Sequence, residues 1–157
     1  MKIEKSKIMV IDDHPIIHDG LKTLLATEND LEIIETASSV EEALSKLKEK
    51  LPDIAIVDLS LGDTDGTFLI EQVKKLYPEL LVLVYTMSEE KLFAERTAAV
   101  GADGYVMKTS PPATLKKAIR TILSGDLYFT PESKRRIIRK NQGRGNSPTT
   151  LLDTLSN

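Results

Sequence analysis

Short apolar runs alternate with amphipathic segments along the chain. Five runs rich in Val, Ile and Leu predict buried strands, at about residues 7–12, 32–37, 53–58, 80–86 and 103–107. Apolar residues at helical spacing predict the helices, at about residues 15–28, 39–50, 66–77, 89–99 and 112–124. Because strands and helices alternate, the pattern predicts an α/β fold with a doubly wound, five-stranded parallel sheet and five flanking helices.

The character of the sequence changes after about residue 128. The segment TPESKRRIIRK predicts a short basic helix, with Thr130 as its cap and Pro131 at its first position. The following NQGRGNSPTT is rich in turn residues, and LLDTLSN then begins a new apolar pattern. We therefore predict one domain over residues 1–128 and, over residues 129–157, a helix and linker that lead to a segment beyond this chain.

Charge and composition narrow the classes of function. The net charge of −3 is divided into −7 over residues 1–130 and +4 over residues 131–157, where six Lys and Arg face Glu132 and Asp153. The acidic part suits a cation site. The basic part could contact nucleic acid, but a solvated helix face is the simpler interpretation. Without Cys, disulfides and thiolate metal sites are excluded. The first apolar stretch is too short for a signal peptide or a membrane span, so we expect a cytoplasmic protein.

Four of the predicted strands end at reactive side chains, which are Asp12 with Asp13, Asp58, Thr86 and Lys108. The ends of parallel strands meet at one edge of a sheet, where open α/β sheets bind ligands. Three carboxylates in a small space repel one another unless a cation neutralises them, and oxygen ligands suit Mg²⁺.

These residues predict phosphoryl chemistry. A carboxylate at Asp58 can attack a phosphoryl group, Lys108 can hold a phosphoryl oxygen, and Thr86 can donate a hydrogen bond. Each residue also has a simpler reading: Asp12 and Asp13 could cap the first helix, Lys108 could be a solvated lysine and Thr86 a neutral strand-end threonine. Only their joint spacing favours a site.

The segments VIDDHP, DIAIVDLSLGDTDG, LVYTMS and GADGYVMKTSP together resemble the receiver domain of bacterial two-component response regulators. With SGDLYFTPE they are most similar to the NarL/LuxR-type subfamily. The resemblance implies a flavodoxin-like (CheY-like) sheet of order 2-1-3-4-5. It also assigns roles to matching positions: Asp58 as phosphoacceptor, Asp12 and Asp13 with the backbone carbonyl of Ser60 as Mg²⁺ ligands, Lys108 as phosphate-binding lysine, and Thr86 with Tyr105 as switch residues.

The resemblance also implies partners. A sensor histidine kinase would donate the phosphoryl group, a homodimer could form on phosphorylation, and DNA would be bound only through a C-terminal helix-turn-helix domain that this chain lacks. The domain itself would be a signalling switch rather than an enzyme. One departure is Leu61-Gly62, where the family often has Met-Pro; glycine frees the backbone that proline would fix, so we expect a more mobile loop beside Asp58.

Two other functions remain open at this point. A phosphohydrolase of the haloacid-dehalogenase type would also use an aspartyl phosphate, but it usually carries a second Asp two residues after the nucleophile, where this chain has Ser60. A flavodoxin-like binding module would need a glycine-rich phosphate loop after the first strand, which is absent. His14 and His18 lack a third nitrogen ligand nearby in sequence, so we expect solvent-facing histidines.

Overall fold

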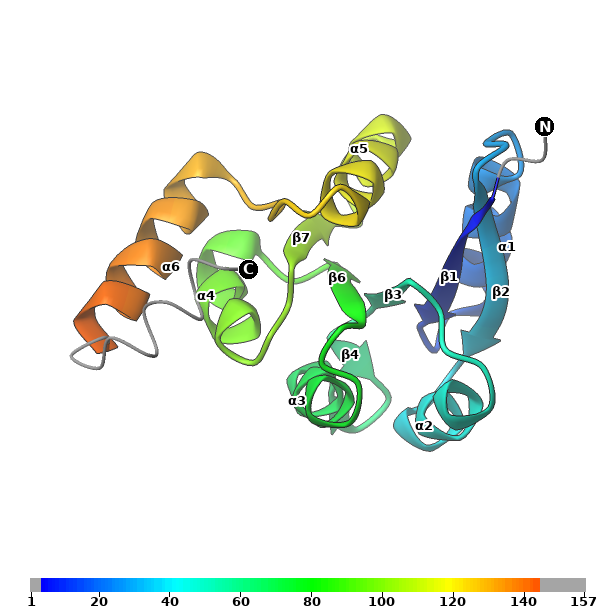
Figure 1. Ribbon diagram of the computed structural model, residues 1–157, viewed down its shortest axis with the longest axis horizontal. Coiled ribbons are helices and arrows are strands. Elements are labelled where there is room, and N and C mark those ends of the chain that lie inside the picture. The colour runs from blue at the N-terminus through cyan, green and yellow to red at the C-terminus, as the bar shows by residue number, and fades with distance from the viewer. Residues whose placement is uncertain (1–3, 145–157) are drawn as a thin grey trace.

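The computed structural model describes residues 4–144. A parallel sheet of five strands runs through the centre of the molecule (Figure 1), in the order β2-β1-β3-β6-β7. Its strands are β1 (Ser6–Ile11), β2 (Leu31–Ala37), β3 (Ile54–Val57), β6 (Leu81–Thr86) and β7 (Gly104–Met107). Numbered within this sheet alone, the order is 2-1-3-4-5, so the predicted CheY-like, doubly wound α/β fold is confirmed.

Five helices cover the two faces of the sheet, as predicted. They are α1 (Pro15–Leu25), α2 (Val40–Glu49), α3 (Gly66–Leu76), α4 (Glu90–Ala99) and α5 (Pro112–Leu123). The apolar faces of α1 and α5 pack on one side of the sheet, and those of α2, α3 and α4 pack on the other (Figure 1). Strand residues such as Ile56 and Val57 alternate between these two cores, because successive strand side chains point to opposite faces.

A small hairpin was not predicted. Two-residue strands β4 (Ser60–Leu61) and β5 (Thr64–Asp65) pair in antiparallel fashion directly after β3. Gly62 stands in the turn with φ of 58°, a left-handed conformation that glycine adopts without strain and that proline cannot adopt. Strands this short have no periodicity to detect, but the turn explains why glycine replaces the more usual proline here.

A sixth helix, α6 (Pro131–Arg144), follows the sheet domain and packs against α4 (Figure 1). The hydroxyl oxygen of Thr130 accepts a hydrogen bond from the amide of Ser133 at 3.2 Å, which confirms the predicted cap. The helix was predicted only as far as Lys140 and continues to Arg144. Packing of the buried Ile137 and an ion pair of Lys140 with Glu95 on α4 stabilise it beyond its local propensity.

Ion pairs and hydrogen bonds fix α6 on α4. The amide of Thr130 donates to Glu90 at 2.7 Å, and the guanidinium of Arg136 donates to the carbonyl of Lys91 at 3.1 Å.

None of the helices within residues 4–144 has the length and apolar composition needed to cross a membrane.

Candidate phosphoacceptor site

The strand register brings the predicted site residues to one edge of the sheet. Ile11 pairs with Val57, so Asp12 and Asp58 follow paired residues on the adjacent strands β1 and β3. On the other side of β3, Thr86 ends β6 and pairs with Met107, and Lys108 comes next. The edge therefore gathers Asp12, Asp58, Thr86 and Lys108 as the sequence predicted.

A buried lysine bridges two of the carboxylates. The Lys108 Nζ lies 2.7 Å from Asp12 Oδ2 and 2.9 Å from Asp58 Oδ2, and the exposed fractions of the three side chains are 7%, 2% and 3%. Burial opposes protonation of the lysine, but the hydrogen bonds and charges of Asp12 and Asp58 outweigh it and raise the pKa of Lys108. Lys108 is therefore a buried cation held against Asp12 and Asp58, not the solvated surface lysine of the simpler reading.

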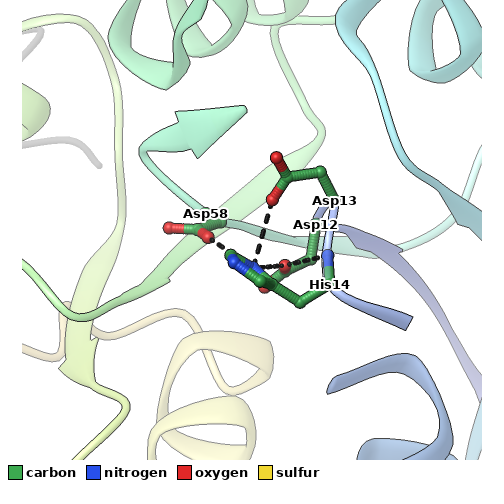
Figure 2. Close-up of side chains that lie close together, drawn as sticks. All are labelled: Asp12, Asp13, His14 and Asp58. Atoms are coloured by element: carbon green, nitrogen blue, oxygen red, sulfur yellow. Dashed lines mark hydrogen bonds and ion pairs between the residues drawn. The ribbon is translucent and has the colours of Figure 1, made fainter. Parts of the chain in front are cut away.

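His14 completes this cluster, which the sequence prediction did not include, although the predicted exposure of His14 to solvent is confirmed. Its Nδ1 lies 2.8 Å from Asp12 Oδ1, 3.1 Å from Asp13 Oδ1 and 3.7 Å from Asp58 Oδ2, and Figure 2 shows the imidazole among the three carboxylates. Its side chain remains 55% exposed on its outer side. The sequence signal was adjacency, because His14 directly follows the predicted acidic pair.

The prediction of a solvent-facing side chain is wrong for the second histidine, His18. His18 is buried, and its Nε2 lies 2.6 Å from the backbone carbonyl oxygen of Asp12. One turn into α1, its ring reaches back beneath the strand end and holds the backbone of the acidic pair. His18 precedes Leu21 and Leu25 by three and seven residues, on the face of α1 that packs against the sheet.

The hairpin holds two of the carboxylates through backbone amides. The amide of Ser60 donates to Asp58 Oδ1 at 3.2 Å, and the amide of Gly62 donates to Asp13 Oδ2 at 2.9 Å. At the base of the hairpin, a Cβ on Gly66 would lie 2.5 Å from the carbonyl oxygen of Asp58. Only glycine allows the start of α3 to approach the acceptor so closely.

The oxygens and nitrogen of this cluster have the chemistry of a divalent-metal site. One ligand atom each from Asp12, Asp13, His14 and Asp58 lies within 4.8 Å of the others. Asp13 Oδ1 is buried, and residues 4–144 offer it no hydrogen-bond donor in suitable geometry, although buried polar atoms are normally satisfied. An acceptor without a donor beside further carboxylates fits a bound cation.

The two predicted switch residues lie next to each other. Thr86 is buried, and its hydroxyl oxygen accepts from the amide of Ser88 at 3.4 Å. The ring of Tyr105 is fully buried, its hydroxyl donates to the carbonyl of Ser88 at 2.7 Å, and burial raises its pKa. Ser88 thus links both side chains, and Tyr105 is not the half-buried ring that a passive role would give.

Comparison with known sequences places this geometry in a family. Residues 8–120 match the model of the response regulator receiver domain. The response regulator protein VraR of Staphylococcus aureus is 32% identical over 126 residues, which are 80% of this chain and 60% of VraR. The oxygen regulatory protein NreC of Staphylococcus carnosus is 29% identical over 135 residues, 85% of this chain and 62% of NreC. The chain spans about three fifths of the length of these relatives.

Solved structures agree with this placement. A LuxR-family response regulator from Aurantimonas sp. SI85-9A1 superposes with a TM-score of 0.78 at 31% identity, over 87% of this chain and 98% of that one. The isolated receiver domain of RcsB from Salmonella enterica serovar Typhimurium, solved with the phosphomimetic BeF₃⁻, gives a TM-score of 0.75 at 26% identity, over 85% of this chain and 99% of that one. With its acidic pocket and buried lysine, the chain belongs to the response regulator receiver domains and has its relatives among the NarL/LuxR-type regulators.

Proposed function

We propose that Asp58 accepts a phosphoryl group from the phosphohistidine of a sensor histidine kinase and that Mg²⁺ is the cation of the site. The bridge from Lys108 to Asp12 and Asp58 carries the proposal. It places a buried cation against the acceptor carboxylate, at the sheet edge where a phosphoryl group would arrive. No purely structural role requires two carboxylates and a lysine at the ends of three strands.

The transfer is a single displacement at phosphorus. A carboxylate oxygen of Asp58 forms the new P–O bond while the P–N bond of the donor breaks, and the leaving imidazole keeps the electron pair and takes up a proton. Lys108 would then neutralise a phosphoryl oxygen. A bound Mg²⁺ would supply positive charge that offsets the negative charge of the carboxylates and of the incoming phosphoryl group.

Four groups would hold the ion: the carboxylates of Asp12, Asp13 and Asp58 and the backbone carbonyl of Ser60. The Ser60 amide donates toward Asp58, and in an extended strand the carbonyl of a residue points to the same side as its amide. The hairpin register therefore supports a carbonyl ligand. Thr86 would donate to the phosphoryl group, and the Ser88 backbone would transmit its movement to Tyr105.

The family also suggests how this chain acts within the parent protein, and this part of the proposal depends on the phosphorylation of Asp58. Residues 1–128 would be the receiver, and residues 129–157 would lead to an output domain through which the parent protein controls transcription. A complex of RcsB with promoter DNA, solved with the phosphomimetic BeF₃⁻, has 26% identity to this chain, which covers 70% of that protein. We propose that this receiver likewise controls an output domain that binds DNA. We also propose that the protein acts in the cytoplasm and that phosphorylation causes it to form a homodimer.

Intact mass after incubation with acetyl phosphate and Mg²⁺ tests the acceptor. The chain should gain one phosphoryl group that hydroxylamine removes, and Asp58→Asn should gain none. Asp63→Asn is the matched control, because Asp63 is exposed in the same hairpin and has no role in the transfer. Equal labelling of Asp58→Asn and the parent would refute the assignment of Asp58.

Sedimentation with and without beryllofluoride and Mg²⁺ tests the switch. A shift toward a dimer, or altered hydrogen exchange in α5 and α6, is expected because phosphorylation needs only to favour one of two conformations. An unchanged mass and exchange pattern while beryllofluoride is bound would show that this chain alone does not switch.

A further inference from the structure

His14 occupies a helix-capping position but does not cap the helix. It is the N-cap of α1 with extended backbone angles (φ −102°, ψ 108°), and its side chain makes no hydrogen bond to the helix. Ser, Thr, Asp or Asn here would satisfy a helix amide and contribute about 1 kcal/mol. The ring instead turns away from the helix and toward the carboxylates (Figure 2), so its placement needs another explanation.

The ring nitrogen lies closest to two carboxylate oxygens that Lys108 does not contact. Lys108 contacts Oδ2 of both Asp12 and Asp58, whereas His14 Nδ1 lies closest to Oδ1 of Asp12 and Oδ1 of Asp13. The second of these oxygens is the buried acceptor for which the described part of the chain offers no donor. Nδ1 lies within hydrogen-bond distance of the Asp12 carboxylate, and a divalent ion bound to the same oxygens would take the place of a hydrogen on that nitrogen.

The spacing of the four donor atoms fits one ion. Ligands about 2.1 Å from an octahedral ion stand about 3.0 Å apart when adjacent and about 4.2 Å apart when opposite. The nitrogen–oxygen distances of 2.8, 3.1 and 3.7 Å and the overall limit of 4.8 Å are of that scale. No large movement of the ring is needed for coordination.

We propose that His14 is a nitrogen ligand of the metal site and that it makes the site prefer divalent transition ions, such as Ni²⁺, Co²⁺ or Fe²⁺, more strongly than oxygen ligands alone would. This inference rests on the metal site of the proposed function and adds the class of ion. Carboxylates, carbonyls and water suit Mg²⁺, whereas imidazole binds the later first-row ions and is a poor ligand for Mg²⁺. The receiver would then respond to which divalent ion is available.

Calorimetric titration of the 157-residue chain with Mg²⁺ and with Ni²⁺ measures this preference directly. His14→Ala removes the nitrogen, and His14→Gln replaces it with an amide oxygen. Both variants should lose at least about tenfold in Ni²⁺ affinity while Mg²⁺ affinity stays within about threefold. Circular dichroism of each variant verifies that the fold is unchanged.

Pulsed electron paramagnetic resonance of bound Mn²⁺ gives a second signature. Imidazole ¹⁴N modulation should be present in the parent and absent in His14→Ala. The chain has only two histidines, and His18 remains in that variant, so a persistent signal would overturn the assignment to His14.

The outcomes separate this inference from the proposed function. If His14→Ala raises the affinity for both Mg²⁺ and Ni²⁺, the imidazole only occupies the place of the ion. If it lowers both affinities equally, the imidazole does not act as a ligand. Either result overturns the inference, while Mg²⁺-dependent labelling of Asp58 would still stand. If the parent binds neither ion, both the inference and the metal part of the proposed function fail.

Discussion

Replacing Lys108 with Met should lower the free energy of unfolding, because Asp12 and Asp58 would remain buried without their cation. At 2.7 and 2.9 Å from its two carboxylates, the ammonium gains about 6 kcal/mol from each contact at an effective dielectric constant of about 20. Most of this attraction is cancelled by the desolvation of the three groups. Removing the lysine leaves two buried, mutually repelling carboxylates, and breaking such a pair costs about 3–5 kcal/mol. We expect about 3 kcal/mol, because the open side of the site at His14 admits water.

Urea unfolding measures this loss of stability in four proteins: the parent, Lys108→Met, the double variant Lys108→Met/Asp58→Asn, and Lys75→Met. Lys108→Met should unfold at a lower urea concentration, and Asp58→Asn in the same chain should recover part of the loss because it removes one of the stranded charges. Lys75→Met is the matched control, since Lys75 forms an exposed pair with Glu71 on α3, and it should change stability by less than about 0.5 kcal/mol. Mg²⁺ should stabilise the Lys108→Met protein more than the parent.

The contribution of Lys108 to the stability of the fold should decrease at high pH. The pKa of Lys108 is raised in the folded protein, above the unfolded value of about 10.4. Its contribution to stability is therefore complete below about pH 10.4 and is lost as the pH rises through the folded pKa. The difference between the parent and Lys108→Met should be constant from pH 7 to 9 and shrink at higher pH. Equal urea midpoints for the two proteins at pH 7 would refute the reasoning.

Three further variants test other parts of the site. Asp13→Ala should weaken Mg²⁺ binding and slow phosphorylation, and should raise the melting temperature without Mg²⁺, because it removes a repelling charge; unchanged Mg²⁺ affinity by calorimetry would contradict the assigned ligand. Gly66→Ala should destabilise the fold by about 1–3 kcal/mol in urea unfolding and slow labelling of Asp58, because its Cβ would lie 2.5 Å from the Asp58 carbonyl. Tyr105→Phe should lose about 1 kcal/mol with its bond to Ser88 and leave the labelling rate unchanged, so a slower rate by intact mass would show that the hydroxyl acts in the transfer itself.

The sheet could be predicted from the sequence because its signals are local. Val- and Ile-rich runs such as Ile54–Val57 are too apolar for loops, and the residues that end them mark the functional edge without any knowledge of contacts. The order of the strands follows from the family resemblance, and the positions of Asp12, Asp58 and Lys108 follow from the order.

The features that were missed depend on contacts between distant residues. The hairpin arises from one glycine in a left-handed turn and from amides that bind carboxylates 2 and 49 positions away in sequence. The burial of His18 depends on which face α1 turns to the sheet, and His14 lies near Asp58 only because the fold pairs β1 with β3. No periodicity of the chain encodes such contacts.

The hairpin holds the acceptor with backbone atoms, and this has a consequence for how such a switch can be tuned. Ser60 contributes its amide to Asp58, while its side chain is exposed beside the acceptor. Evolution or a protein engineer can therefore exchange that side chain without disturbing the carboxylate it adjoins. If Asp58 is phosphorylated as proposed, a small serine would not position an attacking water and an amide or acid there would, so the lifetime of the phosphorylated state could change while phosphorylation itself does not.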